Sequence, residues 1–159
     1  MHPTQITNEK VRAYVLLDHL WKMMDGLGLC VFGFAPRGVM SLDLMIQCLN
    51  AVTGWNTNLF ELMKAAERGT MMARAFNSLE GFTIKDDQLP RRLFDAKPDG
   101  PNAGERIFTE EEFQKGIETL YGVIGCNPET GRPSRGKLIE LGLEWVEELL
   151  RERQGDSRG

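Results

Sequence analysis

The chain is poor in cysteine and histidine, and this scarcity limits the metal chemistry that it can support. Three cysteines stand among 159 residues, at Cys30, Cys48 and Cys126. They are too few and too far apart for a disulfide scaffold, and no Cys-x-x-Cys pair is present to form a zinc knuckle. The two histidines, His2 and His19, have no neighbour at metal-ligand spacing, so we expect each to be structural or solvated.

Long apolar runs and an excess of basic charge are also missing. No apolar run approaches the ~20 residues that a membrane-spanning helix needs. The N-terminal residues, which include Pro3, do not resemble a secretion signal. The net charge is −4, and basic clusters such as Arg91-Arg92 are flanked by acids, which argues against a nucleic-acid groove. We therefore expect a cytoplasmic protein with neither a nucleic-acid nor a membrane partner.

Helical periodicity is the strongest signal in what the chain does contain. The first expected helix starts at a cap on Thr7 or Asn8 and ends at Gly26 or Gly28, because glycine adopts the left-handed conformation at low cost. Its apolar residues recur at the spacing of one helix face. This predicted face consists of Ala13, Leu16, Leu17, Leu20 and Met24.

A second helix is expected to begin after Ser41 and to end at Gly54. Residues 31–40, which precede it, predict a packed loop or a short helical turn. The apolar stripe of this helix is predicted to contain Leu44, Cys48 and Val52, which places Cys48 in the core.

A third helix is expected to begin near Thr57 or Asn58, because Glu61 stands three residues after Asn58 as in a capping box. It is predicted to continue to about Leu79. Gly69 within it costs about 1 kcal/mol relative to alanine, which favours a close helix–helix contact there. The predicted buried face is Leu59, Leu62, Met63 and Ala66.

The second half of the chain is less regular. Proline and glycine predict a long loop over residues 82–108, with a short helix near 90–94. Thr109, followed by three glutamates, starts a helix that runs to about Val123, because acids in the first turn face the positive end of the helix dipole. Ser134 caps a last helix, whose predicted face is Leu138, Leu141, Trp145 and Leu149.

These patterns predict an all-α fold, with about five helices around a single core and a long irregular segment near residues 82–108. One domain is expected over residues 1–153, and residues 154–159 are expected to form a disordered tail.

The most distinctive stretch of the chain is Asp25-Gly26-Leu27-Gly28-Leu29-Cys30. It places a carboxylate and a thiol at the two ends of a glycine-rich turn, directly after the first helix. Such a turn can aim both groups into one small space. The residue types alone leave two other interpretations open, because Asp25 could be a solvated residue at a helix end and Cys30 a buried structural cysteine.

The hexapeptide resembles the second pterin-contact motif of the tungsten-containing aldehyde ferredoxin oxidoreductases. Other matches follow in the order of that family, and together they span roughly residues 10–146. They resemble the C-terminal helical domain of the family and nothing upstream of it. The matching motifs are Thr53-Gly54-Trp55, Glu67-Arg68, Phe76-Asn77 with Gly81, Asp86-Asp87 with Leu89-Pro90 and Arg92, Tyr121, Gly131-x-Pro133, Lys137-Leu138 and Leu141-Gly142-Leu143.

This resemblance implies ligand roles for four residues of the hexapeptide. It implies that Asp25 contacts a pterin of a tungsten or molybdenum bis-pterin cofactor, with Gly28 and Leu29 where the backbone approaches that pterin. It implies that Cys30 is the last of four ligands to a 4Fe–4S cluster. It implies no catalytic residue on this chain. Because three cysteines cannot supply four thiolates, the chain cannot hold such a cluster alone.

The resemblance also implies partners. The complete enzyme would oxidise an aldehyde to a carboxylic acid and pass electrons through the cluster to ferredoxin. The upstream, metal-bearing domains of the family have no match here. The chain is therefore interpreted as a fragment, an expressed domain or a separately encoded piece, inactive and without cofactor in isolation. We also expect a tendency to form homo-oligomers through an exposed apolar face.

Two other interpretations stay open. In one, the chain is a helical interaction module that kept the fold and lost the cofactor. In the other, it belongs to a relative with a different substrate, such as an aromatic acyl-CoA.

Overall fold

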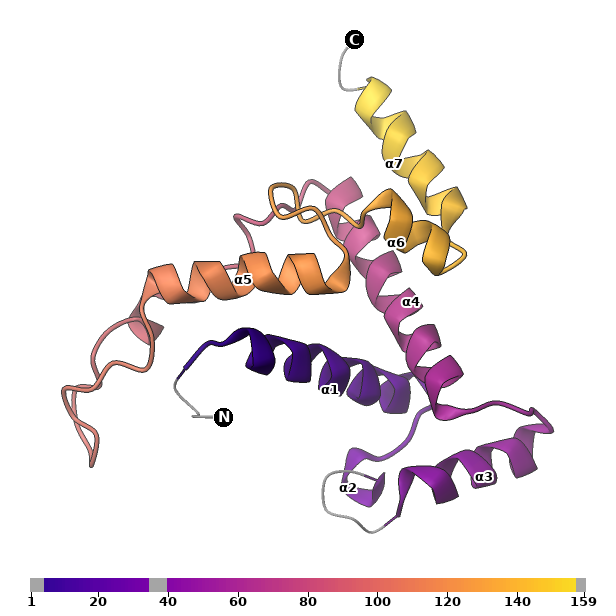
Figure 1. The fold of residues 1–159 in the computed structure, drawn as a ribbon. Coiled ribbons are helices and arrows are strands. Elements are labelled where there is room, and N and C mark those ends of the chain that lie inside the picture. Colours follow the sequence, from indigo (N-terminus) through magenta and orange to yellow (C-terminus); the bar gives the residue numbers. More distant parts are fainter. Residues whose placement is uncertain (1–4, 35–39, 157–159) are drawn as a thin grey trace. The chain divides into compact units, whose positions relative to one another are not determined.

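The computed structural model describes residues 5–34 and 40–156 of the chain, and helices form all of its longer elements (Figure 1). Within these residues there is no strand, only an isolated bridge between Cys126 and Pro133. The all-α class with five longer helices is therefore confirmed. The elements are α1 (Asn8–Gly26), α2 (Val31–Phe34), α3 (Leu42–Thr53), α4 (Leu59–Leu79), the 3₁₀ helix η1 (Arg91–Leu93), α5 (Glu110–Ile124), α6 (Arg135–Glu140) and α7 (Glu144–Asp156).

The chain divides into two compact units. The middle unit is Leu16–Ala73, and the terminal unit combines Met1–Val15 with Arg74–Gly159. The single domain expected over residues 1–153 stays a prediction. The tail expected at 154–159 stays a prediction, since α7 extends to Asp156 and the last three residues lie outside the described part. No helix in the described part is long and apolar enough to cross a membrane.

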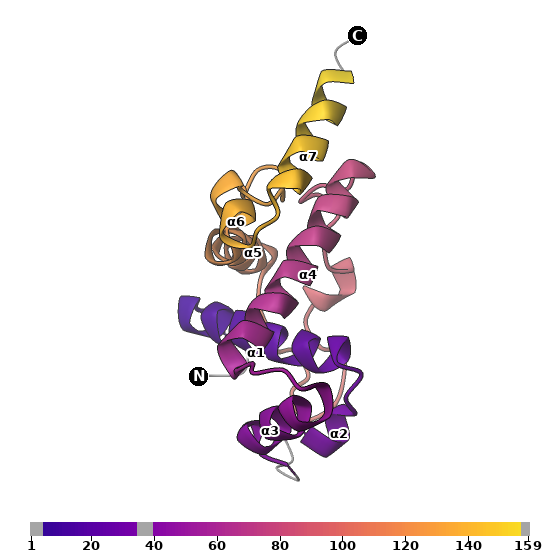
Figure 2. The same cartoon turned by 90° about the vertical axis from the view of Figure 1, so that its right-hand side faces the viewer.

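The middle unit is built around methionine. Figures 1 and 2 show α2 and α3 near the C-terminal end of α1, with the start of α4 in the same unit. Methionine suits such a site because its unbranched chain adapts to irregular space. The buried cluster consists of Met23, Met24, Met45 and Leu62.

Helix α1 starts as predicted but buries a different face. The Thr7 hydroxyl accepts a hydrogen bond from the Lys10 N–H at 3.3 Å, which makes Thr7 the cap. Leu16 and Leu17, however, are 60% and 53% exposed, so the predicted face is wrong for these two residues. Apolar residues occur on more than one side of this helix, and periodicity alone does not say which side meets a neighbour. The buried residues of α1 are Val11, Val15, His19, Met23 and Met24.

Helix α3 also has its predicted ends and a different buried face. The Ser41 hydroxyl accepts from the Leu44 N–H at 3.2 Å, and Gly54 ends the helix with a φ of 74°. Met45 is the buried residue of this helix. The predicted stripe is wrong, because Leu44, Cys48 and Val52 are all exposed. Cys48 is therefore not a core cysteine.

Helix α4 confirms both the capping box and the predicted face. The Asn58 side chain accepts from the Glu61 N–H at 3.1 Å, and the Glu61 carboxylate accepts from the Asn58 N–H at 3.2 Å. Leu62 is buried, and the other three residues of the face are partly buried against the methionine cluster. The close contact expected at Gly69 is wrong, since a Cβ there would meet no atom of the described residues within 4 Å.

In the terminal unit, local signals again place the helix starts. Thr109 forms a capping box with Glu112 at the start of α5. The η1 helix lies where a short helix was predicted, in the otherwise irregular segment before α5. Phe94, Phe108 and Phe113 bring their ring centroids within 5.7–6.2 Å of one another and so anchor this segment to α5.

The last predicted helix is in fact two helices. Ser134 caps α6 as expected, accepting from the Lys137 N–H at 3.2 Å. Gly142 then takes a φ of 63°, which interrupts the helix and separates α6 from α7. The face predicted for one continuous helix is wrong in its second half, since Trp145 and Leu149 are exposed. The buried residues of α6, α7 and their link are Leu138, Leu141, Leu143, Val146 and Leu150.

Candidate functional site

The glycine-rich turn after α1 is a Schellman motif, and it explains two residues of the hexapeptide. Gly28 has a φ of 68°, which L side chains rarely adopt. The Gly28 N–H donates to the Asp25 carbonyl at 3.0 Å, and the Leu29 N–H donates to the Met24 carbonyl at 2.9 Å. Leu29 then packs against the buried methionine cluster. Gly28 and Leu29 therefore close the helix and fix the direction of the chain that leaves it.

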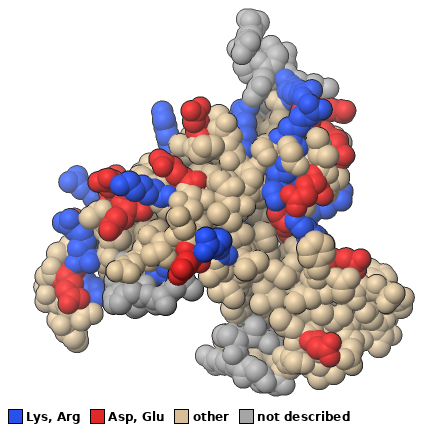
Figure 3. Space-filling view, in the orientation of Figure 1, with Lys and Arg blue, Asp and Glu red and all other residues tan. Residues whose placement is uncertain are grey.

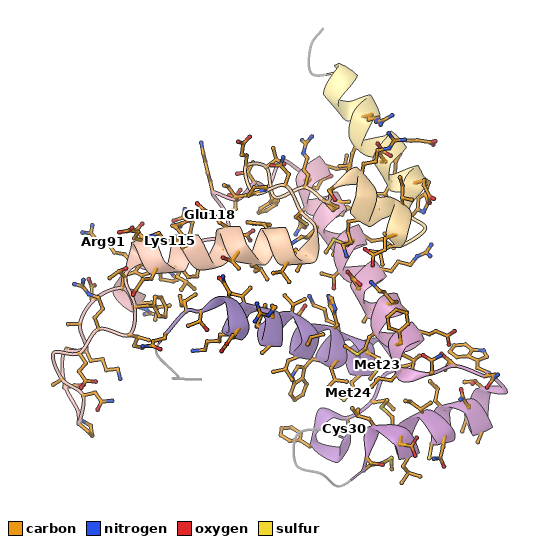
Figure 4. The ribbon with its side chains drawn as sticks, viewed as in Figure 1. Met23, Met24, Cys30, Arg91, Lys115 and Glu118 are labelled. Atoms are coloured by element: carbon orange, nitrogen blue, oxygen red, sulfur yellow. The ribbon has the colours of Figure 1, made fainter. Side chains whose placement is uncertain are left out.

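The two polar side chains of the hexapeptide, Asp25 and Cys30, belong to exposed residues. Asp25 is exposed on the last turn of α1, and Cys30 is an exposed free thiol. Figure 4 shows Cys30 beside α2, with Met23 and Met24 near the end of α1. Both polar residues belong to the middle unit. The interpretation of Cys30 as a buried structural cysteine is therefore wrong.

Burial distinguishes Cys126 and His19 from Cys30. Cys126 is buried in the terminal unit, and burial raises its pKa to about 11. His19 is buried, and burial lowers its pKa, although the negative charge of Glu67 acts to raise it. His2 lies outside the described residues. Among the residues that the structure describes, no group of three or more His, Cys, Asp or Glu could hold a metal ion.

Some residues that carry the sequence resemblance have a structural role. In the terminal unit, the Tyr121 hydroxyl donates to the Asp87 carboxylate, and Arg74 reaches the same oxygen at 3.4 Å. The Arg74 guanidinium lies 4.8 Å from the centroid of the Tyr121 ring. Burial, followed by the hydrogen bond with Asp87, raises the pKa of Tyr121. This cluster ties α4, α5 and the segment after Gly81 together.

The structure also reveals an apolar groove that the sequence analysis missed. It lies in the terminal unit and has a volume of about 400 Å³. Its walls come from two segments about a hundred residues apart, so no local pattern could have indicated it. The lining residues are Ile6, Lys10, Val11, Tyr14, Phe113, Gly116, Ile117 and Leu120.

The fold and the turn thus define an all-helical protein that presents a carboxylate and a thiol beside a capped helix end. The model of one known family, aldehyde ferredoxin oxidoreductase, domains 2 and 3, matches residues 1–143. The chain belongs to the aldehyde ferredoxin oxidoreductase family.

Similar proteins include tungsten-containing aldehyde ferredoxin oxidoreductases of three organisms. The chain is 35% identical to that of Pyrococcus horikoshii over 146 residues, which is 91% of this chain and 23% of the relative. It is 34% identical to that of Thermococcus kodakarensis and 31% identical to that of Pyrococcus furiosus, each over 145 residues, 90% of this chain and 23% of the relative. The chain thus spans about a quarter of the length of these relatives.

Proposed function

We propose that this chain is the C-terminal portion of an oxidoreductase of the aldehyde ferredoxin oxidoreductase type. In this proposal Asp25 binds a pterin and Cys30 supplies the fourth thiolate of a 4Fe–4S cluster. The observation that carries the proposal is the turn itself, where a Schellman motif closes the helix and the carboxylate of Asp25 and the thiol of Cys30 stay exposed.

The chain has too few thiols to hold a cluster without a partner. A 4Fe–4S cluster takes four thiolates, and the chain has three widely spaced cysteines. Cys126 is unsuited, because iron binds the thiolate and burial raises the pKa of this thiol to about 11. An exposed Cys30 can meet three thiolates that another part of the enzyme provides. A cluster is therefore expected only in the complete enzyme.

Asp25 suits the donor-rich edge of a pterin. An ionised carboxylate only accepts hydrogen bonds, and its two oxygens can accept from the paired N–H groups of an aminopyrimidine. The N–H groups of Gly28 and Leu29 are already bonded within the turn. A backbone contact with the pterin would therefore use the carbonyl oxygens of these residues, which are also acceptors. Side chain and backbone thus offer the same kind of group to the ligand.

In the complete enzyme, the tungsten or molybdenum bis-pterin would oxidise an aldehyde to a carboxylic acid, and the electrons would leave through the cluster to ferredoxin. The part played by this chain is to hold one pterin and one corner of the cluster. We expect the chain alone to be inactive towards aldehydes, because in this proposal it supplies one of the four thiolates of the cluster and the rest of the enzyme supplies the others. Its partners are the metal-bearing portion of the enzyme and, for the assembled enzyme, ferredoxin.

The test is coexpression with the Pyrococcus horikoshii relative from which the matching segment has been removed. Iron and tungsten or molybdenum are then measured in the purified complex. We expect Cys30→Ser to lower the iron content and Asp25→Asn to lower the tungsten or molybdenum content. Cys48→Ser and Asp43→Asn are matched controls, since both residues are exposed in the same unit.

Metal contents that do not respond to Cys30→Ser and Asp25→Asn would count against the proposal. A complex that forms without any metal would instead support the second candidate, an interaction module that kept the fold and lost the cofactor.

A further inference from the structure

Helix α3 has the composition of a helix that is covered on more than one side. Over its 12 residues it carries a single charge, Asp43, and its polar side chains Asp43, Gln47 and Asn50 follow one another at helical spacing on one side. A surface helix typically buries an apolar stripe about 100° wide and exposes polar residues elsewhere. The apolar part of α3 is wider than such a stripe, so it offers more surface than one contact needs.

Among the residues that the structure describes, one side of α3 makes such a contact. Met45 is buried on one side of α3, and Leu42, Ile46 and Leu49 pack partly buried against the same methionine cluster. This side holds α3 to the middle unit. The residues of the sequence-predicted stripe, four positions apart, lie on the other side.

That other side is exposed and apolar. We name it the α3 outer face and define it as Leu44, Cys48, Val52 and Trp55. Val52 is 87% exposed and Trp55 is 58% exposed, and Cys48 is an exposed free thiol. Figure 3 shows few charged side chains over α3, at the lower right of that view. Exposed apolar surface of this kind marks interaction sites more often than ordinary solvent-facing surface.

Hydrogen bonds hold the end of this face in place. The Trp55 N–H donates to the Thr53 hydroxyl at 3.2 Å, and that hydroxyl donates to the Leu49 carbonyl at 2.7 Å. The Asn50 side chain donates to the Thr57 carbonyl at 2.9 Å and accepts from the Thr57 N–H at 3.1 Å. The backbone on both sides of Trp55 is thus fixed to α3, so the aromatic ring is presented from an anchored segment.

We propose that the α3 outer face docks the metal-bearing portion of the oxidoreductase. This inference rests on the proposed function. The chain spans 23% of the length of its relatives, so most of such an enzyme lies outside the sequence described. The face belongs to the same unit as Asp25 and Cys30, which need an outside partner for the other cluster ligands. A second copy of this chain is the alternative occupant of the apolar face, and the labelling experiment below separates the two.

Cysteine labelling can follow docking and cluster formation separately. The probe is a small thiol reagent applied to this chain alone and to its complex with the Pyrococcus horikoshii relative that lacks the matching segment. Labelled peptides are quantified by mass spectrometry. In the chain alone we expect Cys30 and Cys48 to react and the buried Cys126 to stay unlabelled as an internal reference. In the complex we expect Cys48 labelling to fall at least about tenfold, with or without iron.

The two cysteines distinguish the inference from the proposed function. Protection of Cys30 that depends on iron, with Cys48 still labelled, would overturn the docking face and leave the proposed function standing. Protection of Cys48, with Cys30 still labelled in the presence of iron, would support the docking face and count against Cys30 as a cluster ligand. Cys48 that is protected in the chain alone, increasingly with concentration, would assign the face to a second copy and overturn the inference. Absence of any complex would also overturn it.

A charge placed on the face provides a second readout. We expect Val52→Glu to weaken the complex by at least about tenfold, because a carboxylate would be buried in an apolar interface. Val123→Glu is the matched control, since Val123 is also exposed on a helix but lies in the terminal unit. Thermal unfolding of each variant alone should match that of the parent chain. Equal binding by the parent and Val52→Glu would contradict the inference.

Discussion

Burial separates Cys126 from the other two thiols of the chain. Its side chain is buried, and burial raises its pKa to about 11, whereas a free cysteine has a pKa of about 8.5. The folded state therefore favours the protonated thiol. This preference stabilises the fold fully below about pH 8.5. The stabilisation is lost as the pH rises toward about 11, where the folded thiol also ionises.

We therefore expect Cys126→Ala to change the pH dependence of stability on the alkaline side. Between about pH 8.5 and about pH 11, the variant should lose less unfolding free energy than the parent chain, because the thiol that resists ionisation is gone. Urea unfolding midpoints over this range give the measurement. Cys48→Ala is the control for removal of an exposed thiol. Parallel curves for all three proteins would show that Cys126 does not titrate as described.

The carboxylate of Asp87 is the common acceptor of Tyr121 and Arg74 in the terminal unit. We expect Asp87→Ala to lower the unfolding free energy by about 1–2 kcal/mol, because two donors lose their partner while part of the charge attraction is screened by water. Asp99→Ala is the control, since Asp99 is exposed in the loop before α5. Equal denaturation midpoints for both variants would contradict a structural role for this cluster.

At the scale of single elements, the two sides of α3 should respond differently to truncation. Met45 is buried, so Met45→Ala should cost about 2–4 kcal/mol through lost contacts and the cavity left behind. Cys48→Ala removes an exposed atom and should change the stability by less than about 0.5 kcal/mol. Chemical unfolding of both variants measures the difference. A larger loss of stability for Cys48→Ala than for Met45→Ala would indicate that the predicted stripe of Leu44, Cys48 and Val52 is the buried side of α3.

The start of α5 offers a test of local stabilisation. Thr109 accepts from the Glu112 N–H at 3.1 Å, and the Glu112 carboxylate accepts from the Thr109 N–H at 2.7 Å. Thr109→Ala should lower the unfolding free energy by about 1 kcal/mol, because the first turn loses its cap. Thr109→Ser keeps the hydroxyl and should stay close to the parent. A similar loss in both variants would point to packing of the Thr109 methyl group and not to capping.

Helix ends were predictable from this sequence because they depend on a few neighbouring residues. Ser41, Asn58, Thr109 and Ser134 all cap helices where their side chains predict. These contacts close within three residues, so no knowledge of the rest of the fold is needed. The break at Gly142 was missed, because apolar spacing continued across it while its φ of 63° stopped the helix.

Helix faces were less predictable, because burial depends on which neighbour meets which side. In α1 and α3 the apolar spacing is real, yet Leu17 and Val52 are exposed. The same limit applies to the candidate site. The sequence identified the hexapeptide, but only the structure shows that Gly28 and Leu29 close the helix while Asp25 and Cys30 remain exposed.

At the scale of the whole molecule, the division into two units predicts which segments a partner protects from amide hydrogen exchange. The candidate turn and the α3 outer face both lie in the middle unit, Leu16–Ala73. Helix α7 belongs to the terminal unit and follows the last residue of the family match, at 143. A partner that binds only the folded chain slows local opening where it binds, and amide hydrogen exchange measures this opening segment by segment.

We therefore expect the metal-bearing portion of the Pyrococcus horikoshii relative to protect amides of α3 and of residues 25–30 from exchange, and to leave α7 unchanged. The reason is that docking adds binding free energy to the opening of the segments it covers, about 2.7 kcal/mol at a hundredfold excess over the dissociation constant, or roughly a hundredfold slower exchange. The Val52→Glu chain is the control and should show little added protection. Protection confined to α7 would place the partner on the terminal unit and remove the structural basis for a cofactor contact at Asp25 and Cys30.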